Sequence, residues 1–204
     1  MKICLYSLSP KVGGGVVIKT ILLLRYLIEE GHNVVWVYPK VSGTLPSYVK
    51  SFLEDYQLKT IEKRAIPYFR ALDSIDFFSE IEGDFDIHQV ISGYCLDGMV
   101  FRRLPKKYFI WSATTLRAEK YDITIMRIRN LKHIVSYLNF RVGLLLEKFA
   151  AKRAYKIFAA SNSSKESIVN EFKLVPDKVQ IIHPVIDTEP VSYTHLTLPT
   201  IYSV

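Results

Sequence analysis

The chain has 204 residues, 49% of them hydrophobic and 23% charged, with a formal net charge of +7 at pH 7. This composition is typical of a globular protein with a real core, and the absence of any run of eighteen apolar residues argues against a spanning helix. Cys4 lies in a buried strand pattern far from Cys95. A disulfide framework is therefore not expected, and without metal-ligand spacing or a signal-peptide pattern we expect a cytoplasmic protein that binds no metal.

The first 38 residues predict a strand, a glycine-rich turn, a helix and a second strand. Residues 3–6 are an apolar run of strand length, and residues 33–38 are β-branched and aromatic without alternation, as in a strand buried on both faces. Residues 16–28 between them are apolar almost all round, which predicts a helix covered on most sides. Gly31 supplies its left-handed stop. A parallel pair with a right-handed crossover follows.

Three consecutive glycines, Gly13, Gly14 and Gly15, precede this helix. The first N–H groups of a helix have no internal partner, and residues without Cβ let a phosphate approach them closely. The run is neither the spaced dinucleotide-binding fingerprint nor a Walker A loop. Two interpretations stay open: an anion-binding turn, or a tight turn that only lets helix and strand pack.

The remaining chain continues to alternate between strand and helix patterns. Helices are predicted over residues 48–56, 69–81 and 165–172, and strands over 58–66, 86–92, 107–111, 156–160 and 179–182. This alternation predicts an α/β fold, a Rossmann-like parallel sheet flanked by helices. Gly93 and Tyr94 follow one strand, and Ser112 and Thr114 open a polar loop (residues 112–121) after the next; such carboxyl-end loops are where ligands bind.

Smaller features of the chain have structural interpretations. Residues 161–164 offer several N-caps for the helix expected at 165–172, and Glu166, three residues after Ser163, permits a capping box. His88 lies inside a strand pattern and is expected in the core, and His183 is expected to be structural.

Basic residues gather between positions 127 and 156, where Glu147 is the one acidic residue. Apolar residues in the same segment approximate a helical face: Ile134, Tyr137, Leu138, Val142, Leu145 and Leu146. One interpretation is a membrane-surface patch that attracts anionic lipid. The other, which we favour, is a long helix with this apolar face on the core and a solvated basic face. Since the basic residues mix with aliphatic ones and no nucleic-acid motif is present, nucleic acid is not expected as a partner.

The order of elements resembles the N-terminal domain of a family-4, retaining, GT-B glycosyltransferase over residues 1–190. The resemblance rests on the opening strand with its glycine turn, on the strand and turn DIHQVISGY, and above all on the closing stretch after residue 153. There the family's pattern is met by Ala154, Tyr155, Ser161, Lys178, Val179, Pro184, Val185, Ile186 and Asp187.

The resemblance implies two facing Rossmann-like domains, the first binding the acceptor and the second the nucleotide-sugar donor. A hexose-like sugar would be transferred with retention, without cofactor or metal, to a glycan, polysaccharide or lipid-linked acceptor. Gly14 and Gly15 would offer N–H groups to the donor diphosphate. Binding candidates are Gly13, Gly14, Gly15, Gly93, Tyr94, Ser112, Thr114 and Ser161; no catalytic residue is assigned. Where the family often has a histidine, this chain has residues 112–115, SATT.

The last fourteen residues, 191–204, carry no Asp, Glu, Lys or Arg and continue no earlier pattern. Back-translated, they resemble the end of a DNA-sequencing adapter read in frame, so we expect them to be foreign to the natural protein. The donor-binding domain would then be missing and the fragment inactive alone. The alternative is a stand-alone nucleotide- or phosphate-binding regulatory module without catalysis.

Overall fold

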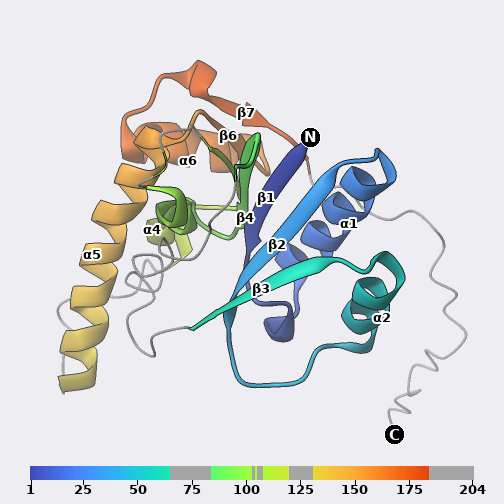
Figure 1. Ribbon diagram of the computed structural model, residues 1–204. Coiled ribbons are helices and arrows are strands. Elements are labelled where there is room, and N and C mark those ends of the chain that lie inside the picture. Colours follow the sequence, from blue (N-terminus) through green and yellow to red (C-terminus); the bar gives the residue numbers. More distant parts are fainter. Residues whose placement is uncertain (65–83, 103, 105–107, 120–130, 184–204) are drawn as a thin grey trace, which may run out of the picture.

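A single parallel sheet forms the centre of the molecule (Figure 1). The structure is a computed structural model and describes residues 1–64, 84–102, 104, 108–119 and 131–183. Within these residues seven strands pair in the order β3-β2-β1-β4-β5-β6-β7, and all their pairings are parallel. The prediction of a Rossmann-like α/β fold is confirmed.

The first half of the sheet is built by two β-α-β crossovers. Its elements are β1 (Lys2–Ser7), the 3-10 turn η1 (Pro10–Val12), α1 (Gly15–Glu29), β2 (Asn33–Lys40), α2 (Ser47–Tyr56) and β3 (Lys59–Arg64). Gly31 ends α1 as predicted, at φ 77°, where the His32 N–H donates to the Leu27 carbonyl over 3.0 Å. Only glycine adopts this left-handed conformation without steric cost, so the sequence sets the length of α1.

The second half of the sheet carries the longest helix. Its elements are β4 (Ile87–Ser92), η3 (Cys95–Phe101), β5 (Phe109–Ser112), α4 (Leu116–Glu119), α5 (Leu131–Arg153), β6 (Lys156–Ala159), α6 (Asn162–Phe172), η5 (Pro176–Lys178) and β7 (Val179–Ile181). The predicted turn after β4 is a 3-10 run, and the predicted loop after β5 contains α4. None of the described helices is long and apolar enough to cross a membrane.

Each face of the sheet has its own core, because alternate residues of a strand point to opposite faces. Cys4, Val37 and Ile110 belong to the cluster that includes α5 and α6 residues such as Ala151 and Phe172. Leu5, Trp36 and Ile91 belong to the cluster that includes residues of α1 and α2. Figure 1 shows α1 and α2 beside β1 to β3, and α5 and α6 beside the other half of the sheet. His88 is buried in the core between Phe85 and Phe101, as predicted.

One prediction about helix burial holds in part and another is wrong. Helix α1 is covered over much of its surface, but not all round: Val17, Thr20 and Leu24 are buried, whereas Ile18 and Tyr26 are 50% and 59% exposed. The face of α5 that we expected on the core points outward, since Ile134, Leu138, Val142 and Leu145 are exposed. Only Leu146 of that set packs against a core cluster.

Small residues explain which side of α5 faces the core. Its buried side is made by Gly143, Glu147, Ala150 and Ala151. A Cβ added to Gly143 would lie 2.8 Å from Leu116 Cδ2, so the helix approaches α4 as closely as it does because that side chain is absent. The bulky apolar residues are left on the opposite side.

Several predictions fall partly or wholly outside the described residues. These are the helix at 69–81, the end of the strand at 58–66, the basic residues at 127–130, the closing residues Pro184–Asp187 and the tail at 191–204. Of those inside, the helix expected at 165–172 begins earlier, at Asn162, because Ser161 is its N-cap. Ser163 is therefore a helical residue, and the expected capping box is wrong.

Candidate functional site at the carboxyl edge of the sheet

The strand order reverses between β1 and β4, which pair with each other at the middle of the sheet. In open parallel sheets, ligands bind outside the carboxyl ends of the strands at such a switch point. Ser7 ends β1 and Ser92 ends β4, one register step apart: Ser7 pairs with Ile91. The predicted site loops therefore leave the sheet side by side.

The glycine turn sits directly at this point. Gly13 and Gly14 have φ of 71° and 88°, and Gly14 is the N-cap of α1 without a side chain to cap it. The Gly14 carbonyl accepts from the N–H groups of Val17 and Ile18 over 3.1 and 3.2 Å. A Cβ added to Gly13, Gly14 or Gly15 would meet nothing within 4 Å. The turn is thus open, and the first N–H groups of α1 have no side-chain cap.

The strand end beneath the turn is held firmly. The Trp36 Nε1–H donates to Ser7 Oγ over 2.8 Å, and both side chains are buried. After Ser9 and Pro10 in the chain, Lys11 of η1 forms an ion pair with Glu62 of β3 at 3.0 Å. These contacts fix the chain on either side of Ser9 and Pro10, so the position of the glycines is determined by the sheet.

The loops after β4 and β5 are tied together by their own polar groups. The Thr114 N–H donates to the Gly93 carbonyl over 2.9 Å, and the Ser112 hydroxyl donates to the Thr114 carbonyl over 2.8 Å. The Ser92 hydroxyl hydrogen-bonds the Asp97 carboxylate. Tyr94 and Ser112 are buried. Their side chains therefore hold the loop, while Gly93 and Thr114 are half-buried beside it.

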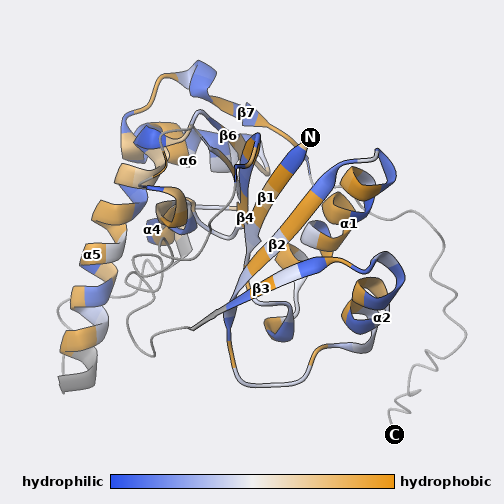
Figure 2. Ribbon diagram, in the orientation of Figure 1, coloured by the Kyte–Doolittle hydropathy of each residue, from blue (hydrophilic) through white to orange (hydrophobic). Residues whose placement is uncertain are grey.

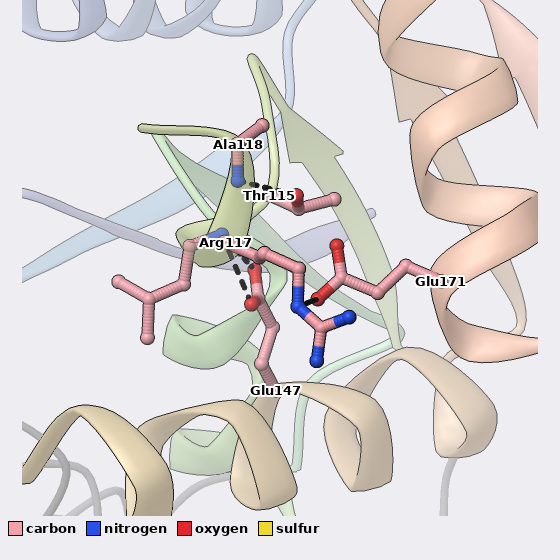
Figure 3. Close-up of polar contacts among 6 residues, drawn as sticks. Thr115, Arg117, Ala118, Glu147 and Glu171 are labelled. Atoms are coloured by element: carbon pink, nitrogen blue, oxygen red, sulfur yellow. Dashed lines mark hydrogen bonds and ion pairs between the residues drawn. The ribbon is translucent and has the colours of Figure 1, made fainter. Parts of the chain in front are cut away.

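Glu147 of α5 joins both loops. Figure 3 shows its contact with the start of α4. Its Oε1 accepts from the Cys95 N–H over 3.1 Å, and its two oxygens accept from the Leu116 N–H over 3.2 and 3.1 Å. The side chain is fully buried, and this burial raises its pKa to about 8, although the N–H groups of Leu116 and Cys95 act in the opposite direction. One buried carboxyl thus fixes the start of η3 and the start of α4.

The start of α6 extends this network to the end of β6. Ser161 Oγ accepts from the Ser164 N–H over 3.1 Å, and the Ser164 hydroxyl donates to the Ala113 carbonyl over 2.6 Å. Arg117 of α4 forms an ion pair with Glu171 of α6 at 3.4 Å (Figure 3). The loops after β4, β5 and β6 are therefore one connected wall beside the switch point.

An apolar groove of about 540 Å³ lies beside α1, over the face of β4 to β6. Gln89, Ile91, Trp111 and Phe158 form its floor; His183, exposed after β7, lines it as well. The Lys19 ammonium lies 4.3 Å from the Trp111 ring centre, and burial lowers its pKa. This groove was not predicted from the sequence, because its residues come from four separate elements and from the segment after β7.

The structure places the predicted site residues along one edge but gives them different surroundings. Gly14 and Gly15 are exposed, Gly13, Gly93, Thr114 and Ser161 are half-buried, and Tyr94 and Ser112 are buried. Sequence reasoning missed Glu147 as part of this edge. The sequence held one indication of this: Glu147 lies four residues after Gly143 and four before Ala151, on the same face of the helix as these small residues. Within the described residues no group of His, Cys, Asp or Glu could hold a metal ion.

Comparisons with known proteins agree with this fold. An alpha-glucosyltransferase in complex with UDP and a DNA containing an HMU base superposes with a TM-score of 0.53 at 20% identity, over 92% of this chain and 43% of its own. The apo UGT2 of Phytolacca americana gives a TM-score of 0.52 at 11% identity, over 92% of this chain and 53% of its own. At such identities the likeness shows the fold alone.

The chain therefore spans about half the length of these solved structures. No curated protein matches it. The family model described as Glycosyltransferase Family 4 matches residues 13–190, which include the three glycines and the loops after β4, β5 and β6. The chain belongs to glycosyltransferase family 4.

Proposed function

We propose that this chain is the acceptor-side domain of a retaining glycosyltransferase. The whole protein would transfer a sugar from a nucleotide-sugar donor to a glycan, polysaccharide or lipid-linked acceptor. A second domain would supply most of the donor contacts, so residues 1–190 alone would be inactive. Family membership supports the transferase class, and the open glycine turn at the switch point is the observation that carries the donor role.

The turn suits the diphosphate of such a donor for two physical reasons. The first N–H groups of α1 lie at the positive end of the helix dipole, where an anion is stabilised. The space over Gly13, Gly14 and Gly15 is empty to 4 Å, so phosphate oxygens can reach the backbone. Charge that develops on the leaving diphosphate would be offset there during transfer. Catalysis would need no metal at this edge.

Substitutions at two neighbouring glycines, Gly14 and Gly15, distinguish a loss of ligand contact from a distortion of the turn. Gly14 has φ 88°, so Gly14→Ala strains the turn whether or not a ligand binds. Gly15 begins α1 with no positive φ, and a Cβ there meets nothing. Gly15→Ala in the full-length protein is expected to keep the melting temperature and to raise the donor KM about tenfold by crowding the phosphate.

The donor KM is measured by kinetics with a nucleotide-sugar and a matched acceptor. The melting temperature of both variants is measured by thermal unfolding. An unchanged donor KM for Gly15→Ala would leave the glycines as turn residues and remove the donor role. Nucleotide binding without sugar transfer by the full-length protein would favour a regulatory module instead.

The nature of the acceptor is less constrained. One of the structural neighbours is described in complex with DNA, so the comparisons lend no support to our expectation that nucleic acid is not a partner. That expectation rests on the mixed apolar and basic character of residues 127–156 and on the absence of a nucleic-acid motif in the sequence.

A further inference from the structure

The outer side of α5 carries a continuous stripe of exposed apolar side chains. The stripe consists of Ile134, Leu138, Val142, Leu145 and Phe149, with Leu138 and Leu145 55% and 71% exposed. Their spacing of three and four residues places them within an arc of about 80° over a length of about 22 Å. Figure 2 shows hydrophobic residues along the described length of this helix. Single exposed apolar residues are ordinary, but a stripe of this length marks an interaction surface.

Cations border this stripe. Arg141 and Lys148 lie along one side of it and Lys152 follows Phe149 at its end, by the same helical geometry. Arg141 and Lys152 are exposed, and in the described part of the chain neither they nor Lys148 form an ion pair. The one acid of α5, Glu147, is buried on the opposite side. Glu171 of α6 lines the same hollow as Arg141 and Lys148, but it forms an ion pair with Arg117, so the cations stay in excess.

The combination of a narrow apolar stripe and an adjacent excess of cations points to one partner. We propose that α5 lies on an anionic lipid surface, with the stripe between the acyl chains and the cations at the phosphate level. A helix of this kind sinks its apolar side into the headgroup boundary, and long Lys and Arg side chains reach back to the headgroups. A protein partner fits less well, because lysine is depleted in protein interfaces.

The surface is independent of the glycosyltransferase assignment, because the stripe and the glycine turn share no residue. Docking through α5 would hold the carboxyl-edge loops at a fixed height above the bilayer, since Glu147 joins the same helix to both loops. Lipid binding can therefore be tested without donor or acceptor.

Vesicle partitioning of the full-length protein tests the proposal. We compare phosphatidylcholine vesicles with vesicles that also contain about 30% phosphatidylglycerol, at low and high salt. The wild type is expected to bind the anionic vesicles and to dissociate with added salt. The variant Leu138→Ser/Leu145→Ser should bind about tenfold more weakly, and Arg141→Gln/Lys148→Gln/Lys152→Gln roughly a hundredfold more weakly.

The matched control is Tyr48→Ser/Val175→Ser, which removes two exposed apolar side chains outside α5, 45% and 68% exposed. It should bind like the wild type, and circular dichroism checks that every variant is folded. No binding by the wild type, equal binding to neutral vesicles, or equal loss in the control would overturn the proposal. So would a wild-type dimer that the stripe variant converts to a monomer without any lipid binding, since the stripe would then cover a second copy.

Discussion

The two sides of the candidate site are built in opposite ways. The glycine turn between β1 and α1 has no side chain over it, and its shape is set by backbone conformation alone. The wall after β4 and β5 is filled instead with buried polar side chains, joined through Glu147, Ser112 and Asp97. A ligand can approach the backbone on the first side, whereas the second is a rigid scaffold that already uses its hydrogen-bonding groups. The first side is therefore suited to contact a ligand, and the second to hold the loops in position.

The largest test of this difference removes the buried carboxyl. Glu147→Ala leaves the N–H groups of Cys95 and Leu116 without their acceptor in a buried place and opens a cavity. We expect the free energy of unfolding to fall by about 3–5 kcal/mol, since each unsatisfied buried group costs about 1–3 kcal/mol. Urea denaturation measures it. Glu166→Ala, at an exposed position of α6, is the control and should change the value by less than about 0.5 kcal/mol.

The protonation of Glu147 gives a second, smaller effect. Its pKa lies at about 8 in the folded chain against an ordinary 4.5, so the folded state holds a proton that the unfolded state has released. This contribution to stability is present in full below 4.5 and is lost as the pH rises through about 8. Glu147→Gln cannot titrate. Its free energy of unfolding relative to the wild type should therefore increase steadily from pH 5 to pH 8, and a constant difference would contradict the raised pKa.

The smallest test concerns the far end of the wall. Ser161→Ala removes the N-cap of α6 and the acceptor of the Ser164 N–H. A loss of about 1 kcal/mol is expected, as for other serine caps. Ser163→Ala, two residues along the same sequence and exposed, is the matched control. Equal effects of the two substitutions would show that Ser161 does not act as a cap.

The sequence predicted best where one residue type decides the backbone. Gly31 ends α1 because of its left-handed conformation, and the run of β-branched and aromatic residues after Asn33 forms β2 because both its faces are covered. From such signals the first parallel strand pair, the fold class and the edge that carries the predicted site residues could be derived. The openness of the glycine turn could not, because it depends on what the rest of the chain leaves uncovered.

The failures share one physical cause. Apolar periodicity shows that a helix has two sides but not which side packs, and in α5 the core takes the small residues Gly143, Ala150 and Ala151. Close approach to α4 and η3 there excluded the larger leucines, which the sequence pattern favoured for the core. The same orientation of the helix buries Glu147. Burial of a polar group depends on partners from distant loops, which local sequence does not reveal.

The pairing of β1 with β4 has a consequence for how the sheet assembles. The Lys2 N–H donates to the Asp86 carboxylate, and the two residues are 84 positions apart in the sequence. No other pair of neighbouring strands in the described sheet is as far apart in sequence as β1 and β4. Closing this loop carries the greatest entropic cost among the pairings, and long-range contacts of this kind slow folding. The candidate site lies at the carboxyl end of this pairing, where the strand groups β3-β2-β1 and β4-β5-β6-β7 meet. A ligand that contacted loops of both groups would therefore connect them.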